Sequence, residues 1–324
     1  MALTTKQILA LQSLPGVGRK TILKIGNSTN DFIDDISFRH VVLSMSKSSR
    51  KIKLSTKDID CALSNAEDNL LTSKKLDISV VSYYENNFPM AFRNAIDCKG
   101  KDSPSIILFY KGDFSLLSMD SIAIIGTRKC SQTAAIASRT LARKFASRGF
   151  CIVSGLAIGC DCAAHEGALD VPNGKTIAVL ANGLDTIYPK TCSDLSERIL
   201  ETGGLLISEN VIGTPALNYT LVARDRLQAA TSLSTVVIQS GVSGGSMHAA
   251  LATYYAGKPL YAVRYSNEEI NSDQTTQGNH LLASNYDAKY IGGYPSMSEM
   301  DNALDLIAEE IRKSKTTQNC FQLS

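Results

Sequence analysis

The sequence has almost no net charge. Its 33 Lys and Arg side chains are nearly balanced by 31 Asp and Glu side chains, which gives a formal charge of +2 at pH 7. Overall charge therefore does not identify a nucleic-acid-binding protein, because such proteins commonly carry a clear excess of basic residues. If this chain binds an anionic polymer, local clusters of basic side chains must supply the attraction.

Long apolar runs are also missing. No run approaches the ~18 consecutive apolar residues of a membrane-spanning helix. The N-terminal segment lacks a basic leader followed by an apolar stretch and a small-residue cleavage site. We therefore expect no membrane association and a cytoplasmic location.

Cysteine pairs of the metal-binding kind are absent. The eight cysteines contain no CxxC pair, and their spacing is not that of a zinc site. Disulfides are rare in the cytoplasm. We expect neither a structural metal nor disulfides, and the sequence indicates no cofactor.

The chain has room for one large domain and one small one, and its hydrophobic content of 44% is enough for a core. From about residue 77 onward, short β-branched runs alternate with amphipathic segments, which predicts an α/β fold with a mostly parallel sheet and flanking helices. The first 75 residues lack comparable strands and predict a small all-α domain. We expect domains over 1–75 and 76–315, with a helix near 298–313 and a flexible tail over 316–324.

One unit of the larger domain can be followed in detail. Ala134, Ala137, Leu141 and Phe145 recur at spacings of three and four, which predicts one apolar helix face, and Gly149 ends the helix. Residues 121–155 then form strand, loop, helix, turn and strand. Ligands of such sheets bind at the carboxyl ends of the strands.

The segment "LQSLPGVGRKTILKI" predicts a tight turn between two short helices at Gly16 and Gly18, followed by Arg19 and Lys20. The backbone N–H groups of such a turn favour anions. The spacing resembles the helix-hairpin-helix motif, which holds nucleic-acid backbone. A packing unit without a ligand is the alternative.

A basic run, "KSSRKIK", follows in the same domain. It contains Lys47, Arg50, Lys51 and Lys53. The run fits either a binding patch or a solvated surface with no ligand.

Three segments of the larger domain are compatible with phosphate. Gly126, Thr127 and Arg128 directly follow an apolar strand, where a loop leading into a helix can hold an anion, although the spacing is not GxGxxG. Residues 243–246 form a second loop that opens a helix. These residues are Ser243, Gly244, Gly245 and Ser246.

The third segment is "YTLVARDRLQAATS", a predicted helix that carries Arg224 and Arg226 near Tyr219. Arginines beside an aromatic suit a single nucleic-acid strand, whose phosphates need charge and whose bases stack. A surface network of the arginines with Asp225 is the alternative.

The stretch "SGLAIGCDCAAHEGAL" places Asp161 and His165 on one helix face, where an acid–base role is conceivable. The alternative, which we favour, is that Asp161 binds backbone N–H groups at the helix start while His165 packs beneath the loop. Cys160 and Cys162 belong to no recognisable nucleophile signature.

Seven segments together resemble the DNA-processing protein DprA (Smf) family, in its order and spacing. They are "FYKGDFSLL", "IAIIGTRKCS", "GFCIVSGLAIGCDCAAHEGAL", "TIAVLANGLDTIYP", "GGLLISE", "RDRLQAATS" and "SGGSMHAALATYYAGKP". The resemblance covers about residues 78–285. It implies a Rossmann-like domain that binds single-stranded DNA without sequence preference, forms a homodimer, passes the strand to a RecA-type recombinase, and has no catalytic residues.

The resemblance also implies the binding residues. Those expected to contact DNA are Gly126, Thr127, Arg128, Lys175, Arg224, Arg226, Ser243, Gly244, Gly245 and Ser246. Those expected to shape the pocket are Ser154, Gly155, Asp161, His165, Gly183 and Asp185. Gly16, Gly18, Arg19 and Lys20 are expected to hold DNA backbone.

This sequence departs from the family pattern at two places. Asp225 stands between the arginines where the family usually has Asn, and Val263, Arg264 and Tyr265 replace the usual Val-Pro-Gly and could rebuild the rim of the site. The alternative function is a nucleotide-binding or nucleotide-processing enzyme on a related scaffold, with Asp161 or Glu209 in the chemistry.

Overall fold

A computed structural model describes residues 3–27, 34–48 and 52–321, with side chains to residue 315. The chain forms two compact units. The first comprises Met1–Arg93 and Ser105–Phe109, and the second comprises Asn94–Pro104 and Tyr110–Ser324. In the described ranges no helix combines the length and apolar character needed to cross a membrane.

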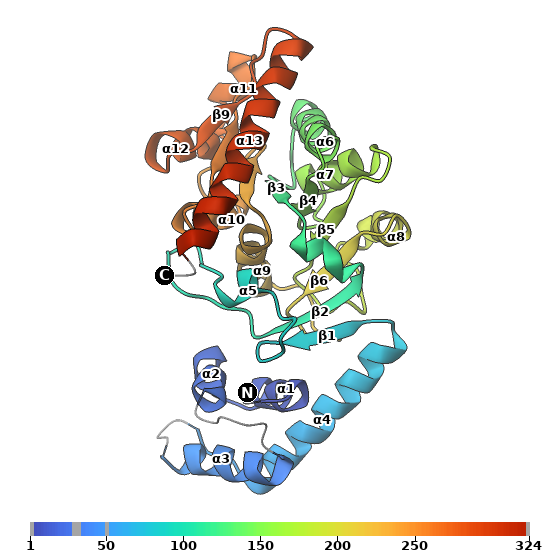
Figure 1. The fold of residues 1–324 in the computed structure, drawn as a ribbon, viewed down its shortest axis with the longest axis vertical. Helices are drawn as coiled ribbons and strands as arrows, with labels where there is room; N and C mark the ends of the chain where they lie inside the picture. Colours follow the sequence, from blue (N-terminus) through green and yellow to red (C-terminus); the bar gives the residue numbers. More distant parts are fainter. Residues whose placement is uncertain (1–2, 28–33, 49–51, 322–324) are drawn as a thin grey trace. The chain divides into compact units, whose positions relative to one another are not determined.

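The first unit is built mainly from helices (Figure 1). Its elements are α1 (Thr5–Ser13), α2 (Arg19–Gly26), α3 (Asp35–Ser48), α4 (Thr56–Lys75), β1 (Ser79–Ser82) and α5 (Met90–Arg93). Capping boxes begin two of the helices, with Thr4 and Gln7 at α1 and Ser55 and Asp58 at α4. The helical part predicted from the sequence ends at Lys75, with α4.

The compact unit continues past residue 75. The Thr5 hydroxyl donates a 2.6 Å hydrogen bond to Oε1 of Glu85, and the hydroxyls of Thr5 and Ser82 lie 2.9 Å apart. These bonds join the β1 segment to α1, which explains why residues up to Arg93 belong to this unit. Strand β2 (Ile107–Gly112) has residues in both units.

The second unit contains a parallel sheet with helices around it, which confirms the α/β prediction. Its strands lie in the order β6-β5-β4-β3-β7-β8-β9, and every neighbouring pair is parallel. The strands are β3 (Ser121–Ile125), β4 (Cys151–Ser154), β5 (Thr176–Val179), β6 (Leu205–Ser208), β7 (Ser234–Val237), β8 (Leu260–Val263) and β9 (Lys289–Ile291).

The connecting segments of this unit are mostly helical (Figure 1). They are η1 (Phe114–Ser118), α6 (Gln132–Ala146), α7 (Cys160–Leu169), η2 (Lys190–Cys192), α8 (Ser193–Glu201), α9 (Asn218–Thr231), α10 (Ser246–Tyr255), α11 (Glu268–Ser272), α12 (Gln277–Asn285) and α13 (Met297–Phe321). The strands β3 to β6 advance toward one edge, whereas β7 returns to the other side of β3. Parallel sheets bind ligands at such a switch point.

Helix α6 packs closely on its neighbour α7. It buries Ala134, Leu141 and Phe145 from the predicted apolar face. A Cβ at Gly167 of α7 would lie 2.2 Å from the carbonyl oxygen of Arg139, so only glycine permits this approach. The chain leaves α6 through a turn at Gly149, where φ is +85°, as the sequence predicted.

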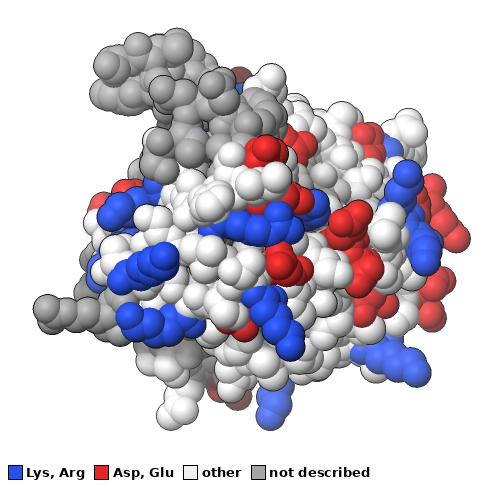
Figure 2. Space-filling view, turned by 90° about the horizontal axis from the view of Figure 1, so that it is seen from below, with Lys and Arg blue, Asp and Glu red and all other residues white. Residues whose placement is uncertain are grey.

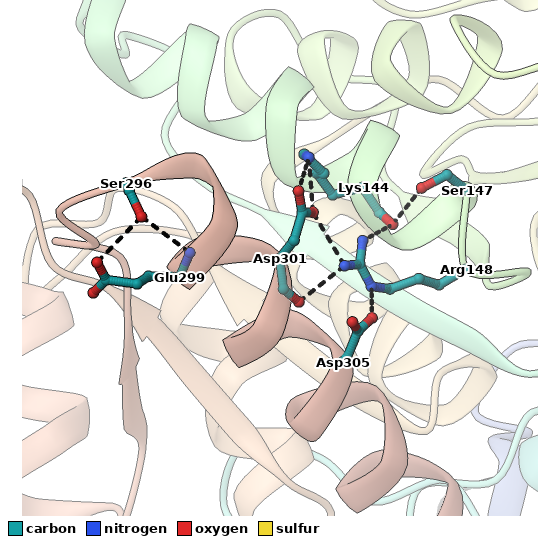
Figure 3. Close-up of polar contacts among 7 residues, drawn as sticks. All are labelled: Lys144, Ser147, Arg148, Ser296, Glu299, Asp301 and Asp305. Carbon is teal, nitrogen blue, oxygen red and sulfur yellow. Dashed lines mark hydrogen bonds and ion pairs between the residues drawn. The ribbon is translucent and has the colours of Figure 1, made fainter.

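Charged side chains join α6 to α13 (Figure 3). The ammonium group of Lys144 lies 2.7 Å from the carboxylate of Asp301, and Nη2 of Arg148 lies 3.1 Å from it. Nε of Arg148 also pairs with Asp305 at 2.7 Å. Lys144 first, and then Arg148, lower the pKa of Asp301.

Helix α13 extends beyond the predicted limit at residue 313. The sequence predicted a flexible tail over 316–324, but the backbone stays helical through Phe321, and residues 322–324 lie outside the described residues. The physical reason is that residues 297–321 contain neither Gly nor Pro, so nothing in the local sequence ends the helix.

Removing the shared carboxylate should weaken the α6–α13 contact. Asp301→Ala is expected to lower the melting temperature more than Asp305→Ala, because Asp301 pairs with two cations and Asp305 with one. The measurement is thermal unfolding followed by circular dichroism, at low and high salt. The difference between the variants should shrink at high salt, where charges are screened. Equal melting temperatures at low salt would contradict this account.

Candidate functional site

A cavity of about 590 Å³ lies at the switch point of the sheet. Residues from the β3–α6 loop, the α7 start, α9 and the α10 start line it. They are Ile125, Gly126, Thr127, Arg128, Lys129, Ala157, Asp161, Asn218, Leu221, Val222, Arg224, Asp225, Gln228, Gly244, Gly245, Ser246, His248, Ala249 and Thr275. The cavity therefore combines basic, acidic and backbone groups.

The β3–α6 loop forms one wall. The Thr127 N–H donates to the carbonyl of Gln239 at 2.8 Å, which fixes the loop beside the end of β7. A Cβ at Gly126 would lie 2.5 Å from Sγ of Cys160, so the loop can approach α7 only with glycine there. Arg128 and Lys129 follow, both exposed. No described carboxylate pairs with either of them, so both can bind an anion.

The start of α10 forms another wall of the cavity. No side chain caps this helix, whose N-cap is Gly245, and the positive end of its dipole lies at the cavity. The Ser246 hydroxyl donates to Oγ of Ser240 at 2.9 Å and steadies the turn. Of the predicted loop, Gly244, Gly245 and Ser246 line the cavity, whereas Ser243 lies exposed in the turn and does not.

Arg224 forms the floor and is buried. Its Nη1 donates to the carbonyl of Val179 at the end of β5, at 2.7 Å, and its Nε lies 3.2 Å from Oδ1 of Asp225. A Cβ at Gly155 would lie 1.6 Å from Nη1. Arg224 and Arg128 also line an adjoining pocket of about 70 Å³ beside Tyr188. Arg224 thus contributes charge to the cavity while anchored from behind.

The expectation that Arg226 contacts a ligand beside Arg224 needs correction, because Arg226 is buried away from the cavity. It donates to Oε2 of Glu209 and to the carbonyl of Ser103, at 2.6 and 2.8 Å, and it does not line the cavity. Residues two positions apart on a helix differ in direction by about 200°. Arg224 and Arg226 therefore cannot face one ligand surface. Tyr219, exposed on the first turn of α9, also does not line the cavity.

Lys175 corrects a second expectation. It precedes β5 (Thr176–Val179), so it lies at the amino edge of the sheet, whereas the cavity lies at the carboxyl edge. Its ammonium group donates to the carbonyl of Thr202 at 2.7 Å. Lys175 is therefore separated from the other residues that the sequence predicted to contact DNA.

Asp161 and His165, the acidic and histidine residues of the sequence motif, make separate contacts from helix α7. Oδ2 of Asp161 accepts the Gly155 N–H at 3.1 Å, and Asp161 lines the cavity. Burial raises the pKa of Asp161 to about 6, opposed by Arg224. His165 is fully buried, and its Nδ1 lies 2.7 Å from Oγ1 of Thr176. Burial lowers the pKa of His165 to about 3, so it remains neutral.

This geometry fits the packing interpretation of the motif. His165 contacts the first residue of β5, whereas Asp161 lies at the cavity, so the two do not form an acid–base pair at one ligand. Ser154 is also buried and donates to the carbonyl of Ile124 at 2.7 Å. These residues fix the loop between β4 and α7.

Gly183 and Asp185 connect two loops near the same edge. The Gly183 N–H donates to the carbonyl of Thr214, and Oδ1 of Asp185 accepts the Gly213 N–H, both at 2.9 Å. They join the loop after β5 to the loop after β6 and line neither of the two pockets described above. Any influence on the cavity is indirect.

His248 and Lys129 were missed by sequence reasoning. Nδ1 of His248 lies 3.6 Å from Oδ2 of Asp225, and this nearby carboxylate raises the pKa of His248. The pair joins two helices, so no spacing in the sequence indicates it. Lys129 could have been found, because it directly follows Arg128.

The second departure from the family pattern lies away from the cavity. Val263, Arg264 and Tyr265 line a separate groove of about 580 Å³. The Tyr265 hydroxyl donates to the carbonyl of Ile238 at 2.9 Å, and the Arg264 guanidinium lies 5.6 Å from the ring centre of Tyr290. The expectation that these residues rebuild the cavity rim is therefore wrong.

The predicted hairpin of the first unit is present as a turn between α1 and α2. Gly16 has a φ of +77°, and Gly18 is the N-cap of α2. Lys20 is exposed, whereas Arg19 is half-buried. The hairpin therefore has the backbone form of an anion site, and its contact with DNA stays a prediction.

In the basic run near α3, Lys47 and Lys53 are exposed, and Arg50 and Lys51 lie outside the described residues. The face of the molecule drawn in Figure 2 carries Lys and Arg side chains interspersed with Asp and Glu side chains. Basic residues on that face do not form one continuous surface.

Comparison with known proteins decides the family. Residues 79–301 match the family described as DNA recombination-mediator protein A. The chain belongs to this family. Protein Smf of Escherichia coli K12 is 36% identical over 156 residues, and the DNA processing protein DprA of Streptococcus pneumoniae R6 is 35% identical over 162 residues. These matches span 48% and 50% of this chain but only 41% and 56% of the relatives.

Solved structures of the recombination-mediator family cover more of the chain. The Streptococcus pneumoniae DprA structure has a TM-score of 0.70 at 25% identity, and covers 92% of this chain and 97% of that one. The Helicobacter pylori protein, reported for its mode of binding single-stranded DNA, has a TM-score of 0.58 at 29% identity over 70% of this chain and 95% of that one.

The close contact between Gly155 and Arg224 can be tested for its contribution to the stability of the fold. Gly155→Ala should displace the Arg224 guanidinium and lower the free energy of unfolding by about 1–3 kcal/mol, as overpacking does. Urea denaturation measures this. Gly245→Ala is the control, because φ is −56° there and a Cβ meets nothing within 4 Å. A similar loss in both variants would mean that the Arg224 contact is not responsible.

The corrected place of Arg226 gives a second test. Glu209→Ala leaves a buried guanidinium without its carboxylate and should lower the free energy of unfolding by about 3–5 kcal/mol. Glu268→Ala, which removes the partner of the exposed Arg264, should have a much smaller effect. Chemical denaturation compares the two. Unchanged stability of Glu209→Ala would show that the pair does not hold α9.

Proposed function

We propose that this chain binds single-stranded DNA without sequence preference at the switch-point cavity and acts as a non-catalytic recombination mediator. One observation carries the proposal: Arg128 and Lys129 are exposed, have no described carboxylate partner, and line the same cavity as the uncapped start of α10. Phosphate binds to such groups without regard to base identity. The Helicobacter pylori relative, reported for its mode of binding single-stranded DNA, supports the same ligand class.

We further propose that the chain works as a homodimer in the cytoplasm and passes its strand to a RecA-type recombinase. Family membership supports a role in recombination. Analytical ultracentrifugation would test the dimer. Strand exchange by a recombinase, measured with and without this protein on coated single strands, would test the transfer.

The nucleotide-enzyme alternative rests on Asp161, whose carboxyl lines the cavity with a raised pKa, as a general acid would. Two contacts weigh against it. Asp161 is held by the Gly155 N–H, and Glu209, the other candidate, is paired with Arg226 at 2.6 Å. Glu209 also does not line the cavity, so the two acids that the sequence suggested do not face one ligand there.

Arg128→Ala tests the binding site. We expect roughly tenfold weaker binding of labelled oligo-dT and of mixed-sequence strands alike, because one charge-assisted phosphate contact is lost. The slope of log affinity against log salt should fall by about 0.7. Fluorescence anisotropy over a salt series measures both quantities.

Lys175→Ala is the matched control, because it removes a basic side chain at the amino edge of the sheet. Its affinity should equal that of the unmodified protein. Equal losses in both variants would contradict the proposed site. Displacement of the strand by a mononucleotide would favour the enzyme alternative.

A further inference from the structure

Asp225 lies between two basic side chains of the cavity, Arg224 and His248. Its Oδ1 lies 3.2 Å from Nε of Arg224 and accepts from Nε2 of Gln228, also at 3.2 Å, and its Oδ2 lies 3.6 Å from Nδ1 of His248. Asp225 is only 7% exposed, so water screens these charges weakly. One carboxylate thus faces a fixed positive charge and a titratable one.

The floor has little positive charge of its own when His248 is neutral. Arg224 is balanced by Asp225, and Asp161 adds a second carboxyl from the α7 start. Protonation of His248 adds one positive charge at the point where the α10 dipole is also positive. The His248 side chain is 35% exposed and lines the cavity, so a ligand can reach it.

Few other charged or titratable side chains lie near His248. Arg128 and Lys129 are the basic side chains that line the cavity from the β3–α6 loop. Burial first, and then Asp97, raise the pKa of the Cys98 thiol, to which Asp225 adds a smaller effect. Strands β7 and β8, which pack against α10, contain no Asp, Glu, Lys, Arg or His. His248 and Asp161 are thus the cavity-lining groups that can change charge near neutral pH.

We propose that His248 is a phosphate-binding residue of the cavity, and that Asp225 controls it by holding its imidazole at the start of α10. This inference rests on the proposed binding of single-stranded DNA. In the protonated state His248 supplies a charged N–H donor to phosphate. In the neutral state the floor contributes a net acidic environment, and only Arg128 and Lys129 attract the strand.

The direction of the pH effect follows from these charges. The Asp225 carboxylate, 3.6 Å from Nδ1, raises the pKa of His248, so the protonated form persists to higher pH than in an isolated histidine. Phosphate binds the protonated form, so affinity should fall as pH rises through that pKa. Loss of the proton from Asp161, whose pKa is about 6, acts in the same direction at lower pH.

The test measures oligo-dT affinity by anisotropy from pH 5.5 to 8.5 at constant ionic strength. We expect the unmodified protein to bind at least fivefold more tightly at pH 6 than at pH 8.5. His248→Gln should remove most of this change. His40→Gln, which alters an exposed histidine of α3, should retain it. Asp225→Asn should shift the change to lower pH and tighten binding at pH 8.5.

A second measurement follows the imidazole itself. Proton NMR titration of the four histidines, with His248 assigned from His248→Gln, should give a His248 pKa that falls in Asp225→Asn and rises when oligo-dT is added. A His248 pKa that does not respond to oligo-dT overturns the inference. This measurement on the unmodified protein applies even if a variant folds poorly, once the signal is assigned.

The outcomes separate this inference from the proposed function. Absence of strand binding at every pH removes the proposed function. Binding that is independent of pH, or that keeps its full pH dependence in His248→Gln, removes the role of His248 and leaves the proposed function standing. A remaining change centred near pH 6 in that variant would assign the effect to Asp161.

Discussion

The cavity depends on the contacts of the buried Arg224 guanidinium with the Val179 carbonyl and with Asp225. Burying a guanidinium is costly unless hydrogen bonds and an opposite charge compensate for its lost hydration. Here the Val179 carbonyl and Asp225 do so, and Gly155 provides the space. These contacts connect the ends of β4 and β5 to α9. The positions of the Asp161 carboxyl and of the cavity floor follow from them.

The small net charge of the chain is consistent with this arrangement. A protein with a strongly basic surface attracts polyanions over its whole surface, whereas one with balanced charge attracts them only where basic groups lack partners. Several cations of the second unit are paired: Lys144 and Arg148 with α13, and Arg226 with Glu209. Arg128 and Lys129 differ from these, because they line the cavity and have no carboxylate partner among the described residues.

The sequence was sufficient for the sheet and the edge that carries the site, because alternating strands and helices restrict a parallel sheet to few arrangements. The sequence was not sufficient to predict which face of a helix, or which end of a strand, carries a given side chain. Arg226 was placed on the correct helix but on the wrong face. Lys175 was grouped with the residues expected to contact DNA, although it precedes β5 at the other edge of the sheet. His248 escaped notice because its partner Asp225 is on another helix, and only packing brings them together.

The contact between Gly155 and Arg224 also constrains how this sequence can change. A methyl group at position 155 is incompatible with the guanidinium, but a smaller residue at position 224 would remove the clash. The effects of changing the two positions are therefore not additive, and the cost of the first change depends on which one comes first. A lineage that alters position 224 before position 155 avoids the loss of stability that the clash would cause.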